Sequence, residues 1–193
     1  MIHKKRIVFG ITGASGAIYA QRMLKLIENR KDILEVALII SASGKEVWHY
    51  ELGVEVPISP IIKSYPNDSF FAPPASGSAG YDAMIVIPCT MGTLGRIAHG
   101  TSNELITRSA DVMLKERKPL ILVVRESPFS LIHIENMRLV TLAGGVILPA
   151  SPSFYSIPGS IEELVDTVVH RAIGMLGLEV DGFRWGREDK GSY

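Results

Sequence analysis

Two charged residues stand directly after an apolar run, where they could take part in chemistry. The run Leu120–Val124 (LILVV) is followed at once by Arg125 and Glu126. A charged pair at the end of a buried strand is costly unless it is solvated or has a chemical role. Arg125 could bind an anion and Glu126 could transfer a proton. The alternative is that the two residues form an ion pair with each other at the rim of a sheet.

A second group of candidates consists of glycines and hydroxyls. The segment GITGASGAIYA (10–20) allows a tight turn before a helix whose free N–H groups could bind an anion. The segment PCTMGTLG (88–95) adds two threonine hydroxyls. Neither segment matches the dinucleotide fingerprint or the GK[ST] phosphate motif, so a mononucleotide is favoured over NAD, with a purely structural turn as the alternative. The candidates are Gly13, Ser15, Thr90 and Thr93.

Three further side chains could hold a phosphate. Arg171 lies at the shoulder of the apolar stripe of the last predicted helix, and Tyr155 belongs to the loop PSFYSIPGS that precedes this helix. Lys115 shares one edge of a helix predicted over 102–117 with Arg108. Cations at helix edges are usually only solvated. A tyrosine hydroxyl and a guanidinium on adjacent elements could nevertheless hold one phosphate together.

The apolar pattern predicts the elements that position these residues. Short Val/Ile/Leu runs alternate with segments of helical spacing, which is typical of parallel strands connected by helices. The last helix begins with a capping box at Ser160 and Glu163 and ends at Gly177. We therefore expect a doubly wound, mostly parallel sheet with helices on both faces, a Rossmann/flavodoxin-like three-layer sandwich, with ligands at the carboxyl ends of its strands. The predicted strands are Ile7–Phe9, Leu34–Ile40, Ala83–Ile87, Leu120–Val124 and Val146–Leu148.

Length and composition restrict the function classes. The chain has 193 residues, of which 47% are apolar and 21% charged, and its 20 basic residues balance 20 acidic ones. It therefore lacks the positive charge typical of nucleic-acid or membrane-surface binding. The single cysteine, Cys89, excludes an internal disulfide and favours a cytoplasmic location, and a buried structural role for it is more typical than catalysis. We expect one domain over 1–178 and a polar tail over 179–193.

The chain resembles the UbiX-like flavin prenyltransferases, formerly described as phenylacrylic acid or polyprenyl-hydroxybenzoate decarboxylases. The matching stretches run in order from residue 7 to about residue 178. They are GITGASGAIYA, PCTMGTLGRIAHG, SNELITRSADVMLKERKPLILVVRESP and FYSIPGSIEELVDTVVHRAIGMLGL.

This resemblance implies an activity and its site. It implies transfer of a dimethylallyl group from dimethylallyl phosphate to N5 and C6 of reduced FMN, without a metal. The product would be the prenylated cofactor of UbiD-like decarboxylases, and the assembly would be a homododecamer with sites between subunits. For FMN it implies Gly13, Ala14, Ser15, Ser41, Thr90, Met91, Gly92, Thr93 and Arg125. For the prenyl phosphate it implies Lys115, Tyr155 and Arg171, with Glu126, Ser15 and Lys115 as the catalytic residues.

The sequence departs from the family at a few positions, and two alternative functions remain open. Thr90 stands where a serine is expected, which preserves the hydroxyl, and Gly174 replaces a common acidic residue of the last helix. One rival is an FMN-dependent decarboxylase of the same superfamily, whose early catalytic histidine and PxMNxxMW-type stretch are missing here. The other is a non-catalytic FMN carrier, which would have no need for three phosphate-binding side chains.

Overall fold

A computed structural model describes residues 4–180 of the chain. Within these residues, six parallel strands form one sheet in the order β3-β2-β1-β4-β5-β6. The strands up to β3 are added on one side of β1 and the later strands on the other side, so the strand order reverses between β1 and β4. In such sheets ligands bind outside the carboxyl ends of the strands at this switch point. The strands are β1 (Lys5–Ile11), β2 (Ile33–Ile40), β3 (Ile62–Tyr65), β4 (Ala83–Cys89), β5 (Leu120–Val124) and β6 (Val146–Pro149).

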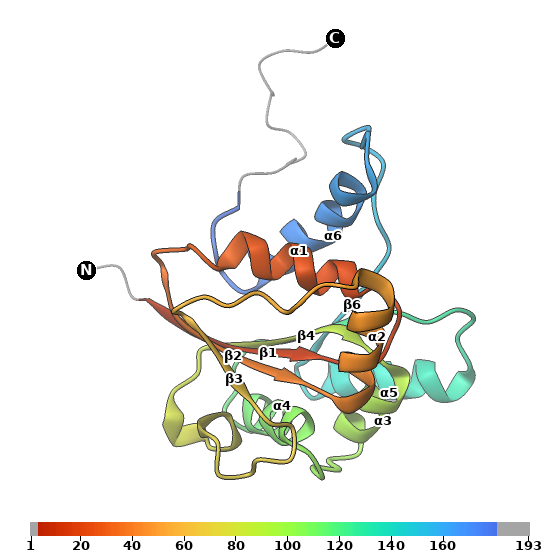
Figure 1. The fold of residues 1–193 in the computed structure, drawn as a ribbon. Helices are drawn as coiled ribbons and strands as arrows, with labels where there is room; N and C mark the ends of the chain where they lie inside the picture. The colour runs from red at the N-terminus through yellow and green to blue at the C-terminus, as the bar shows by residue number, and fades with distance from the viewer. Residues whose placement is uncertain (1–3, 181–193) are drawn as a thin grey trace.

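Helices cover both faces of this sheet (Figure 1). On one face, α1, α6 and Trp48 of α2 pack over the inward side chains of β1, β2 and β4. On the other face, α3, α4 and Val140 of α5 cover the opposite side chains of the same sheet. The strands are buried on both faces because their apolar runs are nearly continuous. The helices are α1 (Ala17–Ile27), α2 (Ala42–Leu52), α3 (Met91–Ala98), α4 (Leu105–Lys115), α5 (Leu131–Leu142) and α6 (Ile161–Met175).

The predicted fold class and all five predicted strands are confirmed, whereas β3 was not predicted. This edge strand has four residues, and none of them is fully buried, so it lacks the apolar run of the other strands. Helices α2, α3 and α5 were also missed. Of the expected capping box of α6, Ser160 accepts the Glu163 N–H (3.1 Å), but the Glu163 carboxylate accepts the Gly159 N–H instead (2.7 Å).

Two further features concern membrane-spanning helices and the C-terminal tail. No helix among residues 4–180 is long and apolar enough to cross a membrane. The predicted polar tail lies mostly outside the described residues, and the division into one domain and a tail stays a prediction.

Candidate active site

The carboxyl ends of β1, β4 and β5 meet at one point. Arg125, just after β5, donates from Nε to the carbonyl of Ser15 (3.1 Å). Thr12, just after β1, donates from Oγ1 to the carbonyl of Pro88 (2.8 Å) and accepts the N–H of Thr90 (2.9 Å). These bonds fix the turn after β1 against the two neighbouring strand ends. The predicted residues Ser15, Thr90 and Arg125 therefore come together, as their positions after parallel strands indicated.

The ion pair between Arg125 and Glu126 that the sequence left open as the alternative is absent from the contacts of the described residues. Arg125 bonds Ser15, while Glu126 Oε1 accepts the N–H of its neighbour Ser127 (3.0 Å). Both side chains are half-buried at the strand edge. The pair is thus not self-neutralised, and both groups remain able to act on a ligand.

The N-terminus of α1 carries an acidic group that was not predicted. The carboxylate of Glu51, at the end of α2, accepts the N–H of Gly16 (2.9 Å to Oε2) and of Ala17 (2.8 Å). The sequence indicated that these N–H groups could bind an anion; in this structure the N–H groups of Gly16 and Ala17 donate to Glu51. Their binding of an anionic ligand stays a prediction. The stretch containing Glu51 has only a weak apolar pattern, so no sequence signal identified it.

Glu51 is held in its charged form. Partial burial raises the pKa of a carboxyl, but hydrogen bonds from the Ser15 side chain and from the Ala17 and Gly16 N–H groups oppose this. The positive charge of Arg125 acts in the same direction. The net result is a pKa of Glu51 below its ordinary value. A carboxylate, Ser15 and Arg125 thus form one hydrogen-bonded and charge-coupled group.

Small side chains allow a close approach to the turn after β1. A Cβ on Gly13 would lie 2.4 Å from Ser43 Oγ and 2.5 Å from Ser43 Cβ, so only glycine fits there. Gly16 has a φ of 106°, which also favours glycine. Ser41 caps α2 by accepting the Gly44 N–H (3.0 Å), and Ala14 is 5% exposed. These residues, which we call the cradle, thus pack the turns after β1 and β2 closely together.

The turn between β4 and α3 supplies the hydroxyls of the site. Thr90 is the N-cap of α3, and its Oγ1 accepts the Thr93 N–H (3.1 Å) and donates to Thr93 Oγ1 (3.0 Å). Thr90 is half-buried and Gly92 is exposed, so both can face a ligand. Thr93 and Met91 are only 2% and 7% exposed and lie beneath this surface.

Tyr155 and Arg171 line a separate groove. The loop after β6 is fixed to α6 because Ser153 N–H donates to Thr167 Oγ1 (3.1 Å), one helical turn before Arg171. The groove has a volume of about 1150 Å³, and Asp166 and His170 also line it. Arg125 and Glu126 are not among its lining residues. Tyr155 and Arg171 therefore line one groove, to which Arg125 and Glu126 do not contribute; a phosphate held by both stays a prediction.

Lys115 lies at the other edge of the sheet. It ends α4, and a short connection over 116–119 leads to the start of β5, whereas Arg125 follows the far end of β5. Five strand residues separate these edges by roughly 16 Å. Lys115 is exposed and donates to Glu116 (2.6 Å). One chain alone therefore does not bring Lys115 to the other predicted residues.

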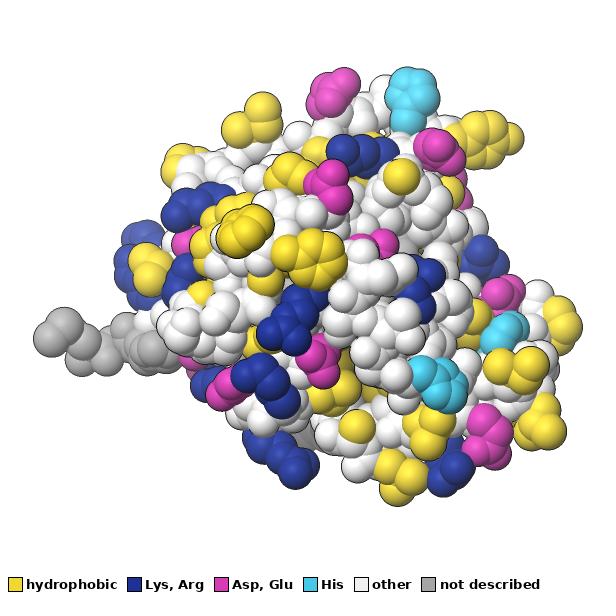
Figure 2. All heavy atoms as spheres, turned by 90° about the horizontal axis from the view of Figure 1, so that it is seen from below, with side chains coloured by type: hydrophobic (Ala, Val, Ile, Leu, Met, Phe, Trp, Pro, Cys, Tyr) yellow, Lys and Arg dark blue, Asp and Glu magenta, His cyan; other side chains and the backbone are white. Residues whose placement is uncertain are grey.

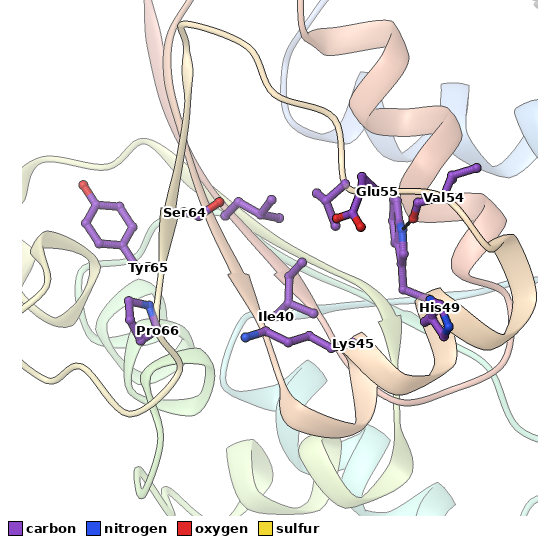
Figure 3. Close-up of a pocket in the computed structure, with 11 residues that line it drawn as sticks. Ile40, Lys45, His49, Val54, Glu55, Ser64, Tyr65 and Pro66 are labelled. Carbon is purple, nitrogen blue, oxygen red and sulfur yellow. Dashed lines mark hydrogen bonds between the residues drawn. The ribbon is translucent and has the colours of Figure 1, made fainter.

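Other groups play no visible part in this arrangement. Burial raises the pKa of the Cys89 thiol to about 12, so it stays protonated and inert. A second hollow of about 510 Å³ lies between α2 and β3, and Figure 3 shows Lys45, His49 and Glu55 at its walls. It contains none of the predicted site residues. Within residues 4–180, no group of three or more His, Cys, Asp or Glu side chains could hold a metal ion.

The fold and the site define a flavoprotein of the doubly wound class. The family described as Flavoprotein matches residues 1–173. The flavin prenyltransferase UbiX of Methanocaldococcus jannaschii is 44% identical over 184 residues, covering 94% of this chain and 98% of that protein. The chain therefore belongs to the UbiX flavin prenyltransferases.

Solved structures agree with this assignment. The structure of AnUbiX in complex with FMN and dimethylallyl pyrophosphate is 37% identical, with a TM-score of 0.81 over 94% of this chain and 100% of that one. A dodecameric FMN-dependent UbiX-like decarboxylase from Escherichia coli O157:H7 is 34% identical, with a TM-score of 0.85 over 93% and 98% of the two chains.

Proposed function

We propose that this enzyme transfers a dimethylallyl group from dimethylallyl phosphate to N5 and C6 of reduced FMN. The observation that carries the proposal is the pair of sites that the chain builds. One is a glycine-walled cradle with Ser15, Thr90 and Arg125 at the strand ends. The other is a groove with Tyr155 and Arg171 that suits a phosphate. A relative that resembles this chain over nearly its full length was solved with FMN and dimethylallyl pyrophosphate.

The residues of the first site fit FMN. Gly13, Ala14 and Ser15 allow the nucleotide to approach the backbone, and Ser41, Thr90, Met91, Gly92 and Thr93 form the neighbouring turns. Arg125 supplies a positive charge beside them. When bound in its reduced form, FMN supplies the nucleophilic positions of the reaction.

The remaining residues act on the prenyl phosphate. Arg171 and Lys115 stabilise the negative charge that develops on the phosphate as the allylic carbon–oxygen bond breaks, and Tyr155 donates a hydrogen bond to it. Such groups are most effective when they are fixed in a site with little water. Closing the last ring requires one proton to be added to the prenyl double bond and one to be removed from C6; Glu126 gives the first and accepts the second, with Ser15 as the relay. Glu51, bonded to the same turn, keeps Ser15 in place.

The position of Lys115 requires more than one copy of the chain. We propose a homododecamer in which Lys115 of one copy joins the site of another, as the dodecameric relative suggests. Figure 2 shows hydrophobic side chains exposed among charged ones on the face of the molecule seen from below. On α5 and just before it, five large apolar side chains are exposed, which is typical of a buried interface. They are Phe129, Leu131, Ile132, Ile134 and Leu142.

The product would serve a UbiD-like decarboxylase in the cytoplasm. The partner is implied by the family resemblance, and the cytoplasmic location is favoured by the single free cysteine. The alternative of a decarboxylase or a non-catalytic FMN carrier is not favoured, because neither needs a second groove with Tyr155 and Arg171 at its wall.

Weighing the flavin after the reaction tests the proposal. The protein is incubated without oxygen with reduced FMN and dimethylallyl phosphate, and the flavin mass is then measured. We expect a gain of one dimethylallyl unit, and no gain when Arg171→Met replaces the wild type. An unchanged flavin mass with the wild-type protein would overturn the proposal.

A further inference from the structure

Arg96 connects the threonine turn to the rest of the molecule. It lies on α3, one turn past Thr93, and its Nη2 donates to Thr93 Oγ1 (3.2 Å) and to Glu104 Oε1 (2.9 Å). Its side chain runs back toward the start of the helix, where Nη1 comes within 3.9 Å of the position that a Cβ on Gly92 would take. Arg96 Nε is buried and has no hydrogen-bond partner within residues 4–180. The guanidinium is thus directed at the beginning of α3.

The surroundings hold this guanidinium in one position. Glu104, at the start of α4, pairs with Arg96 through Oε1 and accepts the Asn67 side-chain amide through Oε2 (2.7 Å). Asn67 Oδ1 in turn accepts the N–H of Ile106 (3.0 Å). A planar guanidinium can donate to two acceptors at fixed angles, which a lysine ammonium does less well. Arg96 is therefore a fixed donor to Thr93.

The hydroxyl of Thr93 cannot reach a ligand by itself. Thr93 is 2% exposed, and its Oγ1 receives two donors, from Thr90 and from Arg96. A hydroxyl has two lone pairs and one hydrogen. Both lone pairs of Thr93 Oγ1 accept a hydrogen bond, so its hydrogen remains available to donate. Thr90, whose hydroxyl is bonded to that of Thr93, is half-buried and therefore more accessible than Thr93.

The two threonine hydroxyls can reverse their bond. If an acceptor approaches Thr90, Thr93 can donate its hydrogen to Thr90 Oγ1, and the hydrogen of Thr90 then turns outward. Thr90 Oγ1 would accept the Thr93 N–H and O–H and donate to the ligand, which uses all its capacity. Arg96 keeps one lone pair of Thr93 bonded throughout. A charged donor at the inner end also polarises the chain and strengthens its outer bond.

We propose that Arg96 is a positioning residue that acts through Thr93 and makes Thr90 a hydrogen-bond donor to an oxygen of FMN. The inference rests on the proposed FMN site and adds a second positive side chain to it. Arg96 does not touch the flavin. Its effect on binding therefore depends on the hydroxyl of residue 90.

A double-mutant cycle tests this dependence. The dissociation constant of FMN is measured by fluorescence titration for the wild type, Arg96→Gln, Thr90→Val and the double variant. We expect Arg96→Gln alone to weaken FMN binding about 3- to 10-fold, as for a lost hydrogen bond. In the Thr90→Val background, Arg96→Gln should add less than about twofold, and in the Thr90→Ser background it should act in full.

Controls separate this relay from a loss of fold or of function. Arg138→Gln removes an exposed arginine that is ion-paired on α5 (2.8 Å to Glu135), and it should leave FMN binding unchanged. Thermal unfolding without FMN shows which variants fold, and only folded variants enter the cycle.

The outcomes distinguish the two proposals. Equal weakening by Arg96→Gln in the wild-type and Thr90→Val backgrounds, or no weakening at all, overturns the relay while the FMN site stands. Tight FMN binding that Thr90→Val does not alter removes Thr90 from the site and overturns the relay as well. A wild-type protein that does not bind FMN overturns the proposed function itself.

Discussion

At the scale of single residues, the two candidate charged side chains Arg125 and Glu126 are each bonded to the backbone and not to one another. Arg125 bonds the Ser15 carbonyl, and Glu126 bonds the next N–H of its own chain. Each keeps a charge available at the carboxyl edge of the sheet. This differs from a structural ion pair, in which the two charges would satisfy one another.

Glu126 is the residue to test for proton transfer. We expect Glu126→Gln to slow formation of the prenylated flavin at least about 100-fold, since a general base typically contributes 10²–10⁴ in rate. FMN affinity should change little, because the amide keeps the size of the side chain. Single-turnover assays followed by flavin mass measure the rate. Glu135→Gln, on the exposed face of α5, is the matched control, and a wild-type rate for Glu126→Gln would remove this role.

Glu51 predicts a pH dependence of stability. Its pKa is lowered in the folded protein, mainly by the hydrogen bonds that outweigh its burial, so its stabilising effect is present above the ordinary carboxyl pKa. This stabilisation is lost as the pH falls below that value and through the lowered pKa. Denaturant unfolding between about pH 3 and pH 7 should show a steeper loss for the wild type than for Glu51→Gln. Parallel curves for the two proteins would contradict this assignment, and Glu46→Gln, also on α2, serves as the control.

At the scale of elements, two glycines affect the stability of the segments that contain them in opposite ways. Gly13→Ala would push a Cβ into Ser43, whose own Cβ cannot rotate away. We expect this variant to lose about 1–3 kcal/mol of unfolding free energy, as for other overpacked sites. FMN binding should weaken as well, because the turn must move. An unfolding free energy equal to that of the wild type would show that the cradle is not tight.

Gly174 offers the opposite case. It lies in α6, where a Cβ would meet nothing within 4 Å, and its backbone is helical. Gly174→Ala should therefore stabilise the protein by about 0.5–1 kcal/mol, because alanine loses less backbone freedom on folding. Thermal or denaturant unfolding measures the difference. A loss of stability would mean that the groove beside α6 does not tolerate the methyl group.

The elements also show how far the sequence could predict the structure. Buried strands such as Leu120–Val124 were visible because both of their faces are apolar. The edge strand β3 was not, since none of its residues is fully buried. Helix α5 has exposed apolar side chains around its surface, which removes the one-sided pattern. Residues after strand ends, such as Arg125 and Thr90, could be placed by topology alone. Glu51 lies on α2, whose apolar pattern is weak, and Arg96 lies on α3, which has only eight residues.

At the scale of the whole assembly, the proposed site requires several copies of the chain. Tyr155 with Arg171, Arg125 with Ser15, and Lys115 occupy three separate places on one chain. A shared site would bring them together. Because α5 exposes large apolar side chains, we expect it to lie in the interface.

A charge on α5 should therefore break the assembly. Ile132 is 71% exposed, so Ile132→Asp should not disturb the core of a single chain. We expect light scattering to show smaller particles and the prenyl transfer rate to fall with them. Glu135→Gln on the same helix should assemble normally. A full-sized, fully active Ile132→Asp protein would place the interface elsewhere.

Mixed assemblies can show that the sites are shared. Lys115→Met and Arg125→Met should each be inactive alone. Coexpressed in equal amounts, they should regain activity in about one quarter of the sites, because an intact Lys115 from one copy can meet an intact Arg125 from another. No recovery in mixed oligomers would show that each site uses one chain only.

The proposed function requires cationic side chains to hold the prenyl phosphate beside the flavin. A crystal structure of the assembled protein with FMN and dimethylallyl phosphate would show whether they do. We expect the phosphate within hydrogen-bonding distance of Arg171 and Tyr155 and of Lys115 from a neighbouring copy, with the flavin against the Ser15 and Arg125 turn. A phosphate bound away from these side chains in every copy would contradict the account.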